Sequence, residues 1–351
     1  MKKHNNVTQK NPGEVIGIDL GDKMSRYCIV NREGEVVEEG SFRNQVGSIE
    51  KQFGHSGRAR IAVEAGAQSA WIARELEKLG HEVIVANARQ VKWITASDQK
   101  NDRVDAQKLA RLARADQVLL APIEHRTAEQ QAGLSVIRAR DAMVRARTLL
   151  VNTARSLAKG FGLRLPASVT ATFGARALAH LPPALRAALE NLLEQIDGLG
   201  RGIAGQDEKI AALAGQHPEV ERLVSIPGVG TLTGLTYVLT LGRAERFAHS
   251  RDVGSYLGLR PRQRQSGERD PQLGIAKSGD KYLRKLLVQC AHHLLGHWGR
   301  DSALRQWGLA KSGGGKTASK PAIVAVARKL AVLLHRLWVS GESFKPFPKM
   351  V

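Results

Sequence analysis

Short apolar runs bounded by turn residues open the chain, a pattern that predicts β-strands. Two of them, EVIGIDLG (Glu14–Gly21) and ARIAVEAG (Ala59–Gly66), end with an acidic residue and a glycine, and a third, EVIVANA, spans 82–88. Residues 27–42 contain two extended pieces around Asn31–Gly34, which predicts a hairpin turn.

Helical periodicity follows in SAWIARELEKLGH (69–81) and DRVDAQKLARLARA (102–115). The order of four strands, a helix, a strand and a helix predicts a mixed sheet with helices packed against it. Pro122 ends this pattern. We therefore expect a polar tail at 1–12 and an α/β domain over 13–122.

A helical pattern occupies 123–220. Two amphipathic stretches, at 135–162 and 185–215, are joined by a connector that contains several glycines and prolines. They predict either an antiparallel helix pair or a dimerising coiled coil. Because no strict heptad is sustained, packing of both helices on the flanking domains stays open as a third arrangement.

The last region, 221–345, is predicted to be mainly α-helical. In RLVSIPGVGTLTGLTYVLTLG (222–242) a Pro-Gly-Val-Gly turn joins two helical runs, an arrangement similar to a helix-hairpin-helix. Gly228 and Gly230 would let N–H groups at a helix start approach a nucleic-acid phosphate closely. A tight helix–helix turn without DNA contact is the alternative.

The charge balance points to a partner. The 351 residues include 53 Lys and Arg against 33 Asp and Glu, a net charge of +20. This excess favours nucleic acid, because cationic side chains neutralise phosphates and release counterions. A basic protein that binds acidic lipid is the alternative.

Neither cysteine usage nor hydropathy indicates export or a membrane partner. Cys28 and Cys290 lie in different regions, which gives no disulfide framework and fits a reducing cytosol. The N-terminus lacks the apolar segment of a signal peptide, and no apolar run approaches the roughly 18 residues of a membrane span. We expect a cytoplasmic protein.

Four acidic residues stand where carboxylates can converge. Asp19 and Glu64 end predicted strands, and Asp102 and Asp105 share a helix face because they are three residues apart. Oxygen ligands of this kind suit Mg²⁺ or Mn²⁺, which can support phosphoryl transfer. A strand-end turn, a surface acid or a helix N-cap would explain each acid singly. Their combination in a basic α/β protein favours a metal site.

Ser266 lies in a loop rich in basic residues, LRPRQRQSGERD (Leu259–Asp270). Arginines can clamp a scissile phosphate and stabilise its transition state, so a serine here is a candidate nucleophile. Chemistry alone favours the other possibility, a phosphate-binding loop in which Ser266 donates a hydrogen bond. The nucleic-acid-binding residues predicted around it are Arg260, Arg262, Arg264, Arg269, Lys277, Lys281 and Arg284.

Two phosphate-binding motifs are incomplete. IGIDLG is similar to the first phosphate loop of actin-like ATPases, but Asp22 and Lys23 replace the usual Thr or Ser, and no second Asp-Gly-Gly motif follows. KSGGGKT (Lys311–Thr317) has Ala310 in place of the first P-loop glycine, and no predicted strand precedes it. We therefore predict neither nucleotide site.

Seven sequence blocks, in a fixed order, carry a specific resemblance. They are IGIDLG with Asp19, AVEAG with Glu64, KNDRVDAQKLA with Asp102 and Asp105, LVSIPGVGTLTG, FAHSRDVGSYLGLRPRQRQSG with Ser266, KSGDKYLRKLL, and RKLAVLLHRLWVSGESF. Over nearly its whole length the chain resembles the transposases, or recombinases, of the insertion-sequence one-ten and eleven-eleven group. One departure is EAGAQSAW, which replaces a Thr-Gly-x-Tyr-type run and leaves Trp71 to substitute by packing.

The resemblance implies an N-terminal RuvC-like domain of the RNase H fold, with a DEDD metal site formed by the four acids above. It implies a helical coiled-coil segment, and a C-terminal domain in which Ser266 forms a transient phosphoserine link to DNA. It also implies a non-coding bridge RNA that pairs with donor and target DNA, and a dimer or tetramer whose active sites are shared between subunits.

We therefore expect a bacterial DNA transposase that associates with the nucleoid when it acts. The first alternative is a RuvC-like structure-specific nuclease in which a metal-activated water attacks and Ser266 only binds phosphate. The second is a non-enzymatic RNA- or DNA-binding accessory protein, whose acids could be neutralised without loss.

Overall fold

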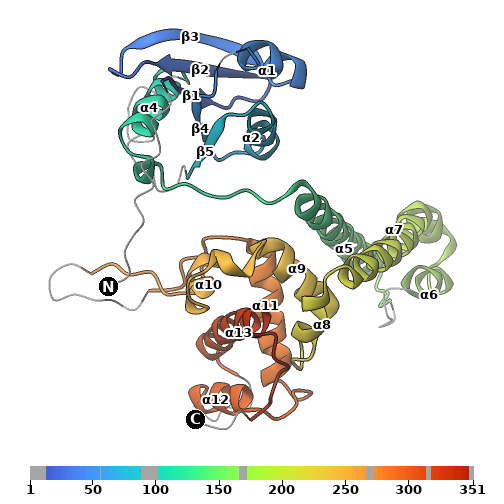
Figure 1. Cartoon of the computed structure of the whole chain (residues 1–351). Helices are drawn as coiled ribbons and strands as arrows, with labels where there is room; N and C mark the ends of the chain where they lie inside the picture. Colours follow the sequence, from blue (N-terminus) through green and yellow to red (C-terminus); the bar gives the residue numbers. More distant parts are fainter. Residues whose placement is uncertain are drawn as a thin grey trace. The chain divides into compact units, whose positions relative to one another are not determined.

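The chain divides into two compact units, residues 1–126 and residues 127–351. The computed structural model describes residues 13–55, 57–87, 102–165, 172–265, 271, 273–313 and 318–347, except for the side chain of Asp102. Figure 1 shows a sheet with helices in the first unit and helices in the second. The finer division predicted above, into a tail and three domains, stays a prediction.

The first unit is built on one mixed sheet of five strands, which confirms the predicted α/β architecture. In space the strands follow the order β3-β2-β1-β4-β5. β1, β2 and β3 are antiparallel neighbours, whereas β1, β4 and β5 run parallel. Their bounds are β1 (Val15–Asp19), β2 (Met24–Val30), β3 (Val36–Arg43), β4 (Arg60–Glu64) and β5 (Glu82–Ala86). This order and pairing are compatible with an RNase H-like fold.

Both faces of the sheet are buried at its centre, where β1 and β4 are apolar on both sides, whereas β3 at one edge is largely exposed. Val15 and Ala62 pack under α4 (Asp102–Ala115), whereas the alternate residues Ile16 and Ile61 pack under α1 (Val46–Phe53) and α2 (Ser69–Lys78). A short 3₁₀ turn, η1 (Gln117–Leu120), follows α4. Helix α1 was not predicted from the sequence.

Gly17 is the point where α4 comes closest to the sheet. A Cβ atom at this position would overlap the carbonyl oxygen of Ala106 and the amide nitrogen of Ala110. Backbone therefore touches backbone at this crossing, which only glycine allows. The contact fixes α4 against the middle of β1.

We predict that Gly17→Ala destabilises the first unit by about 3 kcal/mol, because the overlapping atoms are backbone and cannot move aside. Urea unfolding followed by circular dichroism measures the change. Gly47→Ala is the matched control, since Gly47 lies in α1 with open space around it, and alanine there adds up to roughly 1 kcal/mol of helix propensity. Equal midpoints for the two variants would contradict the close approach.

The second unit begins with two long helices that pack against each other. α5 (Ala128–Gly160) starts with a capping box between Thr127 and Gln130, and α6 (Phe173–Ala179) leads into α7 (Pro183–Gly215). Nη2 of Arg140 donates to Oδ2 of Asp207 at 3.2 Å. Further along α5, Arg147 approaches Gly200, so the two helices run antiparallel within one chain. A coiled-coil dimer stays a prediction.

The remaining helices share one core with the start of α5 and the end of α7 (Figure 1). Tyr237 lies at its centre, fully buried, and donates from its hydroxyl to the carbonyl of Ala331 at 2.6 Å. The elements are α8 (Pro218–Val224), α9 (Thr231–Leu241), η3 (Ala244–Arg246), α10 (Arg251–Tyr256), α11 (Lys281–Leu295), α12 (Ala303–Lys311) and α13 (Lys320–Ser340). In the part of the chain that the structure describes, no helix is both long and apolar enough to cross a lipid bilayer.

Candidate functional site

Two acids end neighbouring strands at the same edge of the sheet. β1 and β4 are parallel, and the register pairs Ile18 with Val63, so Asp19 and Glu64 follow side by side. Each acid is an even number of residues from a side chain or a glycine that faces α4, namely Gly17 and Ala62. Because strand side chains alternate, both carboxylates belong to the face that α4 covers.

The direction of α4 brings its first turn toward the same edge. Arg114, in the last turn, donates from Nη1 to the carbonyl of Arg32 at 2.9 Å and lies against Gly34, in the turn after β2. That turn is at the opposite end of the sheet, because the end of β2 pairs with the start of β1. The N-terminus of α4 therefore points toward Asp19.

Asp105 occupies the second turn of α4 and is 8% exposed. Its Oδ1 lies 3.6 Å from Nζ of Lys108, a helix neighbour that supplies positive charge beside the carboxylate. Asp102 is the first residue of α4, but its side chain lies outside the described residues. The structure thus brings three predicted acids, Asp19, Glu64 and Asp105, to one edge and one face.

The donor chemistry of this edge fits a hard divalent cation, since its acidic side chains offer only oxygen. Within the described residues, no three His, Cys, Asp or Glu side chains are close enough together to hold a metal ion. Like charges repel where nothing neutralises them, and Asp105 is oriented toward Lys108. The helix and the strands therefore supply convergent positions, whereas a closed ligand cage is not formed by the described atoms.

Two amides hold the loop that follows Asp19, and the sequence did not single them out. Nδ2 of Asn44 donates to the carbonyl of Gly21 at 2.9 Å, and Nε2 of Gln68 donates to the same carbonyl at 3.1 Å. Gln68 belongs to the block EAGAQSAW. Trp71, from the same block, packs on the core beneath α2, as expected of a packing residue.

Three of the arginines predicted to bind nucleic acid lie on or beside a two-stranded antiparallel ribbon in the second unit. Pro261 pairs with Ile275, the amide of Arg262 donates to Gly274 at 3.0 Å, and that of Ala276 donates to Arg260 at 2.9 Å. The side chains of Arg260, Arg262 and Arg264 are exposed. Ser266 and Arg269 belong to the connection between the two ribbon strands and lie outside the described residues.

Arg284 holds the base of this ribbon. Its Nη1 donates to the carbonyl of Leu257 at 2.9 Å and to that of Ser278, and burial lowers the pKa of its guanidinium. Lys277 adopts a left-handed backbone with φ 56°, and its amide donates to Gly258 at 3.0 Å. Such a backbone conformation is strained for a non-glycine residue, so the surrounding contacts must hold this turn in place.

A role as phosphate ligands stays a prediction for Lys277 and Lys281, the two exposed lysines near the ribbon base. Lys277 is exposed at the ribbon base, and Lys281 is exposed as the first residue of α11. Asp280 caps that helix by accepting from the amide of Leu283 at 2.8 Å. Arg284 differs from them, because two backbone carbonyls already accept hydrogen bonds from its guanidinium.

The two glycines of the predicted hairpin differ in their surroundings. Gly228 has φ 85°, and a Cβ there would lie 2.9 Å from Cδ2 of His293 on α11, so this glycine is required by packing. Gly230 is the exposed N-cap of α9 and has open space around it. A phosphate contact by Gly230 stays a prediction, and Gly228 has a structural reason of its own.

Neither cysteine offers a competing nucleophile. Both are buried, and burial raises the pKa of Cys28 to about 11 and raises that of Cys290. A thiol attacks as its thiolate, so a raised pKa keeps both side chains inert near neutral pH.

Two family models match the chain. One, described as "Transposase IS116/IS110/IS902 family", matches residues 220–306, which include α9 to α11 and the ribbon. The other, of the DEDD type and described as "Transposase", matches residues 16–162, which include the sheet and its acidic edge. Both units therefore carry family sequence.

Curated relatives extend the similarity to almost the whole chain. A probable family 20 transposase of Pseudomonas aeruginosa is 30% identical and covers 94% of this chain and 98% of its own. The transposase of insertion sequence IS1328 of Yersinia enterocolitica is 30% identical over 79% and 82% of the two chains. That of IS1111A of Coxiella burnetii is 27% identical over 95% and 91%.

Proposed function

Because the chain belongs to the IS116/IS110/IS902 family of transposases and is thus a DNA strand-transfer enzyme, we propose that it works through a serine–phosphodiester intermediate. The carboxylates at the sheet edge would assist that chemistry in an RNase H-like, RuvC-like unit. One observation carries the metal part of the proposal: Asp19 and Glu64 end adjacent strands on the face that α4 covers, and the N-terminus of α4 points toward that edge.

We assign the metal to this edge. Asp19, Glu64 and Asp105, completed by Asp102, would hold Mg²⁺ or Mn²⁺, which prefers carboxylate oxygens together with water and phosphate. When bound, such an ion lowers the cost of charge that builds on phosphate oxygens in the transition state. The half-buried position of the two strand-end acids supports this assignment, since ligands out of bulk water act in a lower dielectric.

The strand-transfer chemistry would use Ser266 as the attacking group. Its Oγ forms a bond to phosphorus while the bond from phosphorus to one deoxyribose oxygen breaks, and the proton lost by the serine leaves with that oxygen. The hydroxyl of another strand then attacks the phosphoserine, restores a phosphodiester and returns the proton to Oγ. Exposed Arg260, Arg262 and Arg264 on the ribbon would neutralise the phosphate throughout.

We further propose that a non-coding bridge RNA pairs with donor and target DNA and that the enzyme acts as a dimer or tetramer. The net charge of +20 supports contact with more nucleic acid than one duplex. Exposed apolar side chains near the end of α5 support self-association: Leu149 and Leu157 on the helix are 66% and 46% exposed, and Phe161, its C-cap, is 66% exposed.

The mechanism is tested by a covalent adduct. End-labelled donor DNA is incubated with the full-length protein, with any required guide RNA, in Mg²⁺ and in EDTA, then denatured and separated on a gel. We expect a protein–DNA adduct in Mg²⁺ and none in EDTA. Free cleaved ends without an adduct would indicate the water-using nuclease instead. Cleavage that continues in EDTA would show that the reaction does not require a divalent metal ion.

A further inference from the structure

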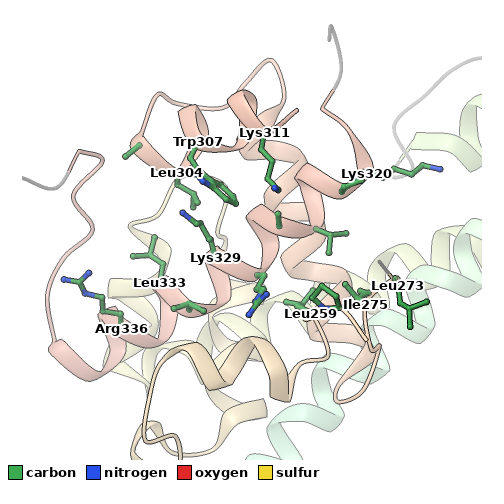
Figure 2. A pocket seen from close by; sticks show the side chains of 18 residues that line it. Leu259, Leu273, Ile275, Leu304, Trp307, Lys311, Lys320, Lys329, Leu333 and Arg336 are labelled. Carbon is green, nitrogen blue, oxygen red and sulfur yellow. The ribbon is translucent and has the colours of Figure 1, made fainter. Parts of the chain in front are cut away.

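A groove of about 1140 Å³ runs along α13 in the second unit (Figure 2). One face of α13 lines it, together with α12 and the ribbon that leads toward Ser266. Small-molecule pockets commonly measure about 300–1,000 Å³, so this groove has room for an extended ligand. Within the part of the chain that the structure describes, none of the residues predicted to act in catalysis or to bind nucleic acid lines this groove.

Cationic and apolar side chains alternate along α13. The basic positions are about eight residues apart, which corresponds to about 12 Å along a helix, and the apolar positions lie between them. From one end of the groove to the other the order is Lys320, then Val324, then Arg328 and Lys329, then Val332 and Leu333, then Arg336. All four cations are exposed, and none of the described residues that line the groove is acidic.

The opposite wall adds an aromatic ring. Trp307 of α12 is half-buried, and Nζ of Lys329 lies 3.8 Å from its ring centroid (Figure 2). The ammonium covers one face of the indole through a cation–π contact of modest strength at an exposed site. A planar group could displace it and leave Lys329 able to reach an anion. The ribbon wall is apolar, with Leu259 and Ile275.

We propose that this groove binds an unpaired stretch of a nucleic-acid strand. Bases would pack on Trp307 and the apolar positions, and phosphates would meet the cations between them. A duplex hides its base faces and would use only the cations, so the apolar positions select a single strand. An acidic partner protein would also fit the charges of the groove. It would not explain why Trp307 lies in the groove beside Lys329.

The inference rests on the proposed function in taking DNA strands as substrate, and it adds where an opened strand is held. The ribbon supplies one wall of the groove through Pro261 and Ile275 and continues to Ser266. A strand lying on α13 would therefore be held next to the element that carries the attacking serine. This groove would both keep the two strands of an opened duplex apart and present one of them to Ser266.

The test measures the affinity of the full-length protein for a fluorescent oligodeoxythymidine of about 12 nucleotides, the scale of single-strand sites. Fluorescence anisotropy at fixed salt reports binding, and a duplex of equal length is measured in parallel. We expect Trp307→Leu to weaken single-strand binding about tenfold, the usual effect of losing one stacked base, and to leave duplex binding unchanged. Lys329→Gln should weaken both, with the larger loss on the single strand.

Matched controls separate the groove from general effects. Trp298→Leu removes a tryptophan that is 79% exposed outside the groove, and Lys209→Gln removes an exposed charge on α7. Equal losses for Trp307→Leu and Trp298→Leu would overturn the proposal, as would unchanged affinity in both groove variants. If the groove variants change the oligomeric state of the protein but not its affinity for the oligonucleotide, the groove is a protein–protein interface instead. Ser266→Ala should bind the oligonucleotide normally, so failure of the serine mechanism would leave this result intact.

Discussion

Replacing Asp19 by asparagine is expected to reduce strand transfer about a thousandfold, which corresponds to about 4 kcal/mol of transition-state stabilisation. Asparagine keeps the shape of the side chain and removes its charge. Asp19 ends β1 beside Glu64, and the loop after it is held by Asn44 and Gln68, so the change should not disturb the fold. Strand transfer is measured on labelled donor and target DNA.

The matched control is Asp22→Asn, which neutralises an exposed acid three residues beyond Asp19. It should retain activity within about twofold, since an exposed charge near the surface is well screened. Binding of donor DNA should stay normal in both variants. Full activity of Asp19→Asn would exclude a role for this carboxylate in metal binding. Glu64→Gln and Asp105→Asn are expected to behave as Asp19→Asn does.

Ser266→Ala is expected to abolish the covalent protein–DNA adduct and to lower strand transfer by about 10⁴-fold or more, the scale of removing a nucleophile. Alanine lacks the oxygen that would bond to phosphorus, whereas the arginines of the ribbon remain. DNA affinity should therefore change little. The adduct is measured on denaturing gels, and affinity is measured by anisotropy.

Ser278→Ala supplies the control, because it removes an exposed serine hydroxyl at the base of the same ribbon. It should form the adduct as the unchanged protein does. If the adduct still forms in Ser266→Ala, the nucleophile must be another side chain. Retained cleavage without an adduct would instead show that Ser266 only binds phosphate.

The sheet was predictable where local pattern and burial agree. Apolar runs bounded by turns identified β1, β4 and β5, whereas the spatial order of the strands came only from the structure. Helix α1 escaped prediction, because its N-cap Gln45 makes no side-chain cap hydrogen bond and only Ile49 and Phe53 are buried. Phe53 stacks edge-on with Phe42 at 5.3 Å, so distant contacts stabilise this helix.

The acidic edge was predictable as a set of residues, but its geometry was not. Strand ends and an i, i+3 pair indicated Asp19, Glu64 and Asp105, whereas the direction of α4 depends on Arg114 meeting the turn after Val30. The groove on α13 was even harder to predict from the sequence. Its central contact joins Trp307 and Lys329 from two helices, and no local pattern connects them.

The close crossing at Gly17 has a consequence for how this enzyme can be re-engineered. Since backbone meets backbone at this crossing, Gly17 fixes the position of α4, and with it that of Asp105, against β1. A redesign that keeps Gly17 can therefore change exposed positions of α4, such as Arg111, without moving Asp105. The acidic edge would keep its geometry while the surface around it was changed.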